Sequence, residues 1–213
     1  MVNVKGKWAL VTGSSRGVGR QIALFMAKEG CNLILHSRSL AHTGKLLAEV
    51  TAMGVEAYAV EAELSDPAAV NRMLDEMEEK GTPVDIVFND AGVQIAYRDN
   101  YWQTPVEDFT QSFMINTIAP AIICYRLIPK MIARGFGRVI NTTSGIRNEP
   151  QQAGYSASKA ALDKFTTDLA SALPEADVMM NLTDPGWLRT DLGGPNAPGA
   201  VESCVPGIVV GAF

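Results

Sequence analysis

The sequence of 213 residues has only three cysteines and two histidines. Cys31, Cys124 and Cys204 are widely separated and show neither metal-binding nor redox spacing, so we expect reduced thiols, a cytoplasmic protein and no metal site. His36 and His42 have no cluster of further ligands around them, and we expect both at the protein surface. The sequence therefore argues against a zinc enzyme and against a disulfide-stabilised fold.

Excess positive charge and long apolar runs are also lacking. The net charge of −5 and the pI of about 5.1 argue against nucleic acid or an anionic membrane as a partner. The most apolar stretch, 115–128, is interrupted by Asn116, Pro120 and Arg126, which predicts that no segment spans a membrane. A hydrophobic content of 47% with 19% charged residues is typical of a compact fold, and we expect residues 1–213 to form a single domain.

Short segments rich in valine, isoleucine and leucine alternate with helical patterns along the chain. This alternation predicts an α/β fold with a parallel sheet, helices on both faces, and ligands at the carboxyl ends of the strands. The expected strands are 7–11, 32–35, 56–60, 84–88, 138–141 and 177–182. The expected helices are 21–27, 40–52, one that begins at 66–67, 106–134 and 156–173.

A glycine-rich turn follows the first expected strand. Residues 12–19 read Thr-Gly-Ser-Ser-Arg-Gly-Val-Gly and lead into the first expected helix. Glycine allows the backbone to turn tightly and to approach a phosphate, and the free N–H groups of a helix N-terminus attract an anion. The spacing differs from the more familiar G-x-G-x-x-G, but the strand, the turn and the helix together predict a nucleotide-binding site.

Tyr155 and Lys159 are four residues apart, so they lie one turn above the other on the same helix face. A free phenol has a pKa of about 10, and an ammonium group beside it favours the phenolate. The pair therefore indicates a general acid/base, with Ser144 as a candidate hydrogen-bond donor to a substrate oxygen. Such pairs also occur on solvated helix faces, and it is the neighbouring motifs that favour catalysis here.

Four further motifs accompany residues 12–19 and the Tyr155/Lys159 pair. They are Asn-Asp-Ala-Gly at 89–92, Met-Ile-Asn-Thr at 114–117, Asn-Thr-Thr-Ser-Gly at 141–145 and Pro-Gly-Trp-Leu-Arg-Thr at 185–190. Taken in this order, the motifs resemble those of the short-chain dehydrogenase/reductase family. The resemblance covers nearly the whole chain. It implies a Rossmann-type doubly wound sheet with strand order 3-2-1-4-5-6, and an oxidoreductase that interconverts a carbonyl and a secondary alcohol.

The resemblance also implies roles for individual residues. Tyr155 is expected to be the general acid/base, and Lys159 to lower the pKa of Tyr155 and to bind the nicotinamide ribose. Ser144 is expected to polarise the substrate oxygen, with Thr143 as the alternative hydroxyl, and Asn116 to bend its helix and hold a relay water. The expected cofactor-binding residues are Gly13, Ser15, Arg16, Gly17, Val18, Gly19, Ser37, Arg38, Glu63, Leu64, Asn89, Ala91, Gly92, Tyr155, Lys159, Pro185, Gly186 and Thr190, and the expected substrate contacts are Gln94, Ser144 and Trp187.

Charge at the end of the second expected strand indicates which cofactor is bound. An NAD(H) site of this kind has a carboxylate there for the ribose 2′-hydroxyl, whereas this strand ends in His36-Ser37-Arg38. Arg38, and Arg16 in the glycine turn, offer guanidinium groups to a 2′-phosphate. We therefore expect NADP(H), with NAD(H) as the less favoured cofactor.

Three features depart from the resembling family. Asp90 replaces the second asparagine of Asn-Asn-Ala-Gly, the loop between Ser144 and Tyr155 is shorter, and the chain stops before a seventh strand. We expect 201–213 to be the helix that precedes such a strand. An exposed strand six would be an unpaired edge, so we expect either a longer natural polypeptide or another chain to cover it.

Two other functions are weighed against the enzyme. One is an inactive nucleotide-binding regulatory protein of the same fold, and the other is an extended sugar-nucleotide epimerase or dehydratase, for which few residues follow Gly186. Apolar positions on more than one face of helix 156–173 predict a homodimer or homotetramer. The aromatic side chains of 94–102 and Trp187 suit a small-molecule substrate with a ring or an apolar body.

Overall fold

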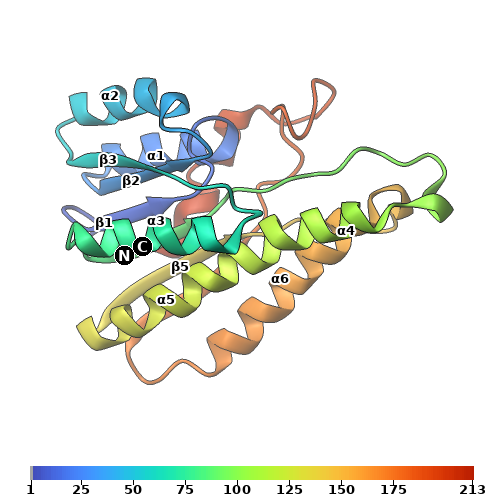
Figure 1. The fold of residues 1–213 in the computed structure, drawn as a ribbon. Helices are drawn as coiled ribbons and strands as arrows, with labels where there is room; N and C mark the ends of the chain where they lie inside the picture. Colours follow the sequence, from blue (N-terminus) through green and yellow to red (C-terminus); the bar gives the residue numbers. More distant parts are fainter. Residues whose placement is uncertain (1) are drawn as a thin grey trace.

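The computed structural model describes residues 2–213, which fold around one sheet of six parallel strands (Figure 1). The strand order is β3-β2-β1-β4-β5-β6, which confirms the predicted doubly wound topology. β1 lies in the middle of the sheet, where Val11 pairs with Leu35 of β2 and with Phe88 of β4. The strands are β1 (Trp8–Val11), β2 (Asn32–Ser37), β3 (Ala57–Glu61), β4 (Val84–Asn89), β5 (Phe136–Thr142) and β6 (Asp177–Thr183).

Helices cover both faces of the sheet, because alternate residues of each strand point to opposite sides. On β1, Val11 packs in one core cluster and Leu10 packs in the other. α1 (Gly17–Lys28) and α2 (Gly44–Ala52) cover the first face. α3 (Pro67–Glu79) and α5 (Ala119–Arg134) cover the second face, and α6 (Ala153–Ser171) packs beside them (Figure 1).

The long helix predicted over 106–134 is interrupted by a π-helical turn. α4 (Val106–Phe113) and α5 flank this turn, Met114–Ile118, which contains Asn116. Its side-chain amide forms two hydrogen bonds with the backbone of Val93, and such bonds favour a local departure from α geometry. The 29 residues are apolar enough to cross a membrane by composition, but the inner residues of α5, such as Ile123, are buried in the core.

The chain after β6 differs from the predicted helix over 201–213. It forms two short 3-10 helices, Val201–Cys204 and Gly207–Ala212, because Pro206, Gly207 and Gly211 are poor residues for an α-helix. Their apolar side chains pack on the α1 face of the core. β6 is the outermost strand, as predicted, and Met179 on it is 52% exposed. The other 3-10 turns are Leu40–His42, Tyr101–Gln103 and Pro150–Gln152.

Candidate active site

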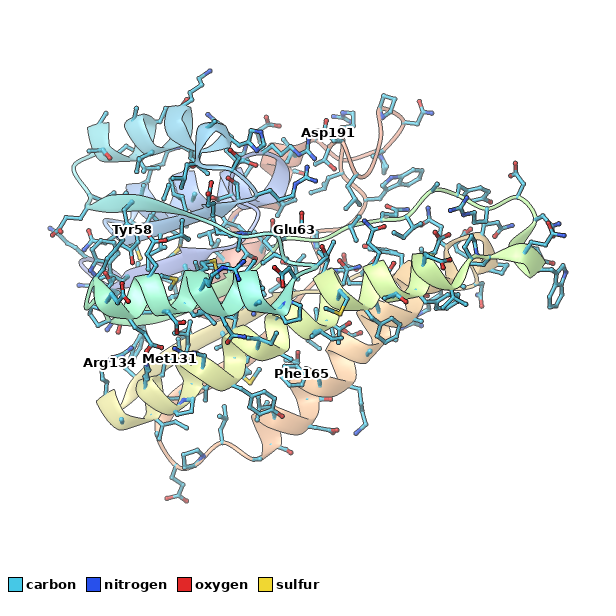
Figure 2. All side chains as sticks on the ribbon, in the orientation of Figure 1. Tyr58, Glu63, Met131, Arg134, Phe165 and Asp191 are labelled. Carbon is cyan, nitrogen blue, oxygen red and sulfur yellow. The ribbon has the colours of Figure 1, made fainter. Side chains whose placement is uncertain are left out.

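A cleft of about 1470 Å³ runs along the carboxyl ends of the strands. Its walls come from the glycine turn after β1 and from the segments that follow β2, β3, β4, β5 and β6, together with the first turns of α6. Figure 2 shows Glu63 and Asp191, which line this cleft, away from Tyr58 and Arg134 near the opposite ends of the strands. The predicted residues that line it are Gly13, Ser15, Arg16, Gly17, Val18, Ser37, Arg38, Glu63, Leu64, Ala91, Gly92, Gln94, Ser144, Tyr155, Lys159, Pro185, Gly186, Trp187 and Thr190.

The glycine turn fits a dinucleotide phosphate. Gly13 and Gly17 have φ of +68° and +59°, and a Cβ on Gly13 would lie 2.8 Å from the Cα of Ala91. A Cβ on Gly19 would lie 2.6 Å from the carbonyl oxygen of Gly13, so Gly19 serves packing within the turn rather than the cleft surface. Arg16 at the N-cap of α1 makes no side-chain capping bond. The first turn of α1 is therefore suited to bind an anion through its backbone N–H groups.

Two arginines were expected at the 2′-phosphate, and their surroundings differ. Arg38 is exposed at the end of β2 and, among residues 2–213, takes part in no ion pair. The guanidinium of Arg16 is paired with the carboxylate of Asp191 at 2.7 Å, both on exposed side chains. The pair joins the glycine turn to the loop after β6, so the charge of Arg16 is already partly balanced. Arg38 is the stronger candidate for the phosphate contact.

His36 is buried, contrary to the expectation that it lies at the surface. Its Nδ1 accepts a hydrogen bond from the N–H of Gly13 at 3.2 Å, and its Nε2 lies 3.1 Å from the carbonyl oxygen of Ala62. The neutral ring thereby joins the glycine turn to the end of β3. Burial lowers the pKa of His36 to about 4. A histidine at the end of a strand is usually expected at the surface. The burial of His36 depends on contacts with residues that are distant in the sequence.

The buried neutral His36 is expected to make stability depend on pH. The folded chain resists protonation until about pH 4, whereas an unfolded histidine binds its proton near pH 6.5. This contribution to stability is therefore present above pH 6.5 and is lost as the pH falls toward 4, by about 3 kcal/mol in all. Urea unfolding of wild type and His36→Asn across this range tests it. Parallel pH curves for the two proteins would contradict the expectation.

Tyr155 lies at the start of α6 with only 7% of its surface exposed. Burial raises the pKa of Tyr155, while a hydrogen bond with the Ser144 side chain opposes this increase. The neighbouring hydroxyl of Thr143 instead donates to the carboxylate of Asp163. Ser144 is therefore the hydroxyl that faces Tyr155, which favours Ser144 over the alternative, Thr143.

Lys159 is buried beneath the cleft, one turn further along α6. Its Nζ lies 6.0 Å from the ring centroid of Tyr155 and donates a hydrogen bond to the carbonyl oxygen of Thr142 at 2.7 Å. Burial lowers the pKa of Lys159 to about 8, and the negative charges of Asp90, Asp163 and Asp184 oppose this decrease. The ammonium group is thus held in place by the last residue of β5.

Asp90 lines the cleft at the end of β4, and no sequence pattern explained it. Its Oδ1 accepts a hydrogen bond from the hydroxyl of Thr142 at 2.9 Å, while its backbone N–H donates to Thr12. Burial raises the pKa of Asp90 to about 6, and the Thr142 hydroxyl, the charge of Lys159 and the N–H of Gly19 oppose this increase. Thr142 therefore contacts both the carboxylate of Asp90 and the ammonium group of Lys159.

Two predicted site residues lie behind the cleft wall. Asn116 is fully buried, and its side chain holds Val93 and the hydroxyl of Ser158. Asn89 was expected to bind cofactor, but its side chain donates to the Oδ1 of Asn141 at 2.8 Å. Asn89 therefore joins β4 to β5 behind the cleft, because its side chain points into the core rather than into the cleft.

The expected substrate contacts lie at the outer end of the cleft. The side chain of Gln94 is hydrogen-bonded to Gln152, just before α6. Trp187 is 62% exposed, and its Nε1 donates to the carbonyl oxygen of Gly193 at 2.7 Å. Asp184, which sequence reasoning missed, accepts hydrogen bonds from the N–H groups of Gly145 and Gly186. Asp184 therefore joins the loops after β5 and β6. In the sequence, its position directly before Pro185-Gly186 was the feature that could have indicated this role.

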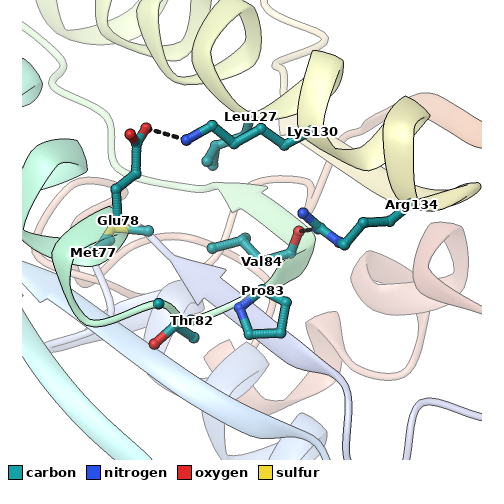
Figure 3. Close-up of a pocket in the computed structure, with 9 residues that line it drawn as sticks. Met77, Glu78, Thr82, Pro83, Val84, Leu127, Lys130 and Arg134 are labelled. Carbon is teal, nitrogen blue, oxygen red and sulfur yellow. Dashed lines mark hydrogen bonds and ion pairs between the residues drawn. The ribbon is translucent and has the colours of Figure 1, made fainter.

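A second pocket lies at the amino end of β4, at the opposite ends of the strands from the cleft (Figure 3). It has a volume of about 350 Å³ and is formed by the end of α3, the start of β4 and the end of α5. Lys130 is paired with Glu78, and Arg134 donates to the carbonyl oxygen of Val84. Its charged groups therefore already have partners. Over residues 2–213, no group of three or more acidic, histidine or cysteine side chains is arranged for a metal ion.

The chain is similar to known proteins in both sequence and structure. A family model described as short chain dehydrogenase matches residues 7–199. A short-chain type dehydrogenase/reductase from Picea abies is 34% identical over 197 residues, which cover 88% of this chain and 72% of that protein.

Two solved structures share the fold and carry bound cofactors. A 3-oxoacyl (acyl-carrier-protein) reductase from Agrobacterium tumefaciens with NADP bound has a TM-score of 0.82 and 31% identity, and the match covers 89% of this chain and 73% of that one. An NAD⁺-bound xylitol dehydrogenase has a TM-score of 0.81 and 29% identity, with the same coverage. Both nicotinamide cofactors thus occur among structural relatives.

Proposed function

The chain belongs to the short-chain dehydrogenase family, and from this premise we propose that it is an NADP(H)-dependent oxidoreductase that interconverts a carbonyl and a secondary alcohol. The observation that supports this most is the meeting of Tyr155 and Ser144 in the cleft, with Lys159 buried one turn below. Ser144 lies in the loop directly after β5, and Tyr155 and Lys159 lie on α6. Such an arrangement suits proton transfer to a bound oxygen.

The proposed mechanism divides the work between cofactor and chain. A bound nicotinamide supplies the hydride. Ser144 donates a hydrogen bond to the carbonyl oxygen and stabilises the negative charge that develops there. Tyr155 gives its proton to this oxygen during reduction and accepts it during oxidation. Lys159 would bind the nicotinamide ribose, and its charge would oppose the increase that burial causes in the pKa of Tyr155.

NADP(H) is the proposed cofactor because two arginines line the cleft, one in the glycine turn and one after β2. Arg38 follows β2 where an NAD(H) site would have a carboxylate, and Arg16 lies at the start of α1. The NADP-bound relative is consistent with this choice, whereas the NAD⁺-bound relative shows that the fold allows either. We also propose a cytoplasmic protein that forms homo-oligomers and binds neither nucleic acid nor membrane.

An inactive nucleotide-binding regulator of the same fold is the competing function. It would need the glycine turn but not the proton-transfer groups. The buried Lys159 and the contact between Ser144 and Tyr155 argue against it, because a regulator would gain nothing from a desolvated ammonium group beside the cleft.

A panel of ketones, sugars, steroids and acyl thioesters, followed by NADPH absorbance, tests the proposed function. We expect at least one carbonyl to be reduced with kcat above 1 s⁻¹, on the order of ordinary enzymes. Exposed aromatic side chains near the cleft mouth, such as Tyr97 and Trp187, favour a substrate with a ring or a long apolar body. NADPH binding without any turnover across the panel would favour the regulator.

A further inference from the structure

Thr142 connects a carboxylate and an ammonium group across the end of β5. Its hydroxyl donates to the Oδ1 of Asp90 at 2.9 Å, and its carbonyl oxygen accepts from the Nζ of Lys159 at 2.7 Å. The second oxygen of Asp90 faces Gly19, where a Cβ would lie only 3.0 Å away. The carboxylate therefore lies between the first turn of α1 and the end of β5, and its negative charge acts on Lys159.

Lys159 needs a negative charge nearby because it is 4% exposed. A buried ammonium group without a partner loses its proton. The negative charges of three carboxylates, Asp90, Asp163 and Asp184, act on it. Asp163 is bonded by the hydroxyl of Thr143, and the exposed Asp184 is bonded by two backbone N–H groups. Asp90 is the carboxylate that shares Thr142 with Lys159.

We propose that Asp90 is a positioning residue for the reaction, which acts through Thr142 to fix the Lys159 side chain and supplies the negative charge that keeps its ammonium protonated. This inference rests on the proposed function of Lys159. The resembling family has an uncharged asparagine at this position, so the negative charge of Asp90 departs from the family pattern. The charge of Asp90 also acts on Cys204, but this residue adds no charge of its own, because burial raises the pKa of its thiol to about 11.

The test measures Lys159 directly in the cofactor-free protein. Lysine labelled with ¹³C at the ε position gives an NMR signal that titrates with the amine, and Lys159→Met identifies the signal by its loss. In wild type we expect the midpoint at about pH 8. In Asp90→Asn, which keeps the shape and a hydrogen-bond acceptor, we expect a midpoint at lower pH.

Asp85→Asn is the matched control. Asp85 lies on β4, the strand that precedes Asp90. It accepts the N–H of Trp8 and pairs with Arg134 at the amino end of the strand, away from the cleft. We expect this variant to leave the Lys159 midpoint unchanged even if it lowers stability. Thr142→Val keeps the carbonyl and removes only the hydroxyl, so a smaller shift in the same direction is expected.

Activity provides the second measurement. With NADPH saturating, the decline in kcat of carbonyl reduction at alkaline pH should move to lower pH in Asp90→Asn, in step with the NMR midpoint. An unchanged NMR midpoint would overturn the proposal, whatever the activity. A shifted midpoint in an enzyme that reduces no carbonyl would leave the electrostatic inference intact and overturn the proposed function instead.

Discussion

Replacing Tyr155 with phenylalanine is expected to lower kcat by about 10³-fold while NADPH binding stays close to wild type. The substitution removes only the hydroxyl that meets Ser144, and the apolar ring keeps its place in the core. The phosphate and ribose contacts expected from the glycine turn and Lys159 are unaffected. Stopped-flow turnover and NADPH fluorescence titration measure the two quantities separately.

Tyr58→Phe is the control for this substitution. Tyr58 is on β3, and its hydroxyl donates to the side chain of Thr82 far from the cleft. This variant removes the same oxygen atom and is expected to keep turnover near the wild-type value. If Tyr155→Phe retained most of its activity, another group would be the proton donor and the proposed mechanism would be wrong.

Reversing the charge of Arg38 should give the second large effect. In Arg38→Asp, we expect NADPH to bind roughly 100-fold more weakly, which corresponds to about 2.7 kcal/mol, because a charge-assisted hydrogen bond is replaced by repulsion. NADH should bind at least as well as before, since a carboxylate at the end of β2 can accept the ribose 2′-hydroxyl. Dissociation constants for both cofactors give the change in preference.

The control for Arg38→Asp must change net charge equally without touching the cleft. Lys164→Asp meets this condition, because Lys164 is exposed on α6 and pairs only with Asp168 among residues 2–213. We expect both cofactors to bind it as they bind wild type. An unchanged preference in Arg38→Asp would assign the phosphate contact elsewhere, first of all to Arg16, once released from Asp191.

Local patterns and the family resemblance together predicted the sheet and many of the residues that line the cleft. The alternation of strands and helices predicted a parallel sheet with helices on both faces, and the resemblance implied the order 3-2-1-4-5-6. The glycine turn was recognisable from residues 12–19 alone. Tyr155 and Lys159 share a helix face because of their spacing, which is a property of any α-helix. These features depend on residues close together in the sequence.

Features that depend on distant contacts were missed. His36 is buried because Gly13 and Ala62 both reach it, and neither contact can be read from the residues around it. The role of Asp90 depends on Thr142, which is 52 positions away. The helix expected over 201–213 was based on the family pattern and was wrong. Proline and glycine in this segment favour the 3-10 turns that form instead.

The parallel arrangement of the strands has a consequence for how the chain folds. β1 pairs with β4, and Trp8 lies opposite Val84. The middle of the sheet therefore forms only when two strands separated by more than 70 residues of chain meet. Each such closure costs chain entropy before any contact repays it, which slows folding. The cleft draws on every strand end, so a partly folded chain offers the cofactor only fragments of its site. NADPH fluorescence during refolding would therefore report the last step of assembly, and cellular cofactor would selectively stabilise completed molecules.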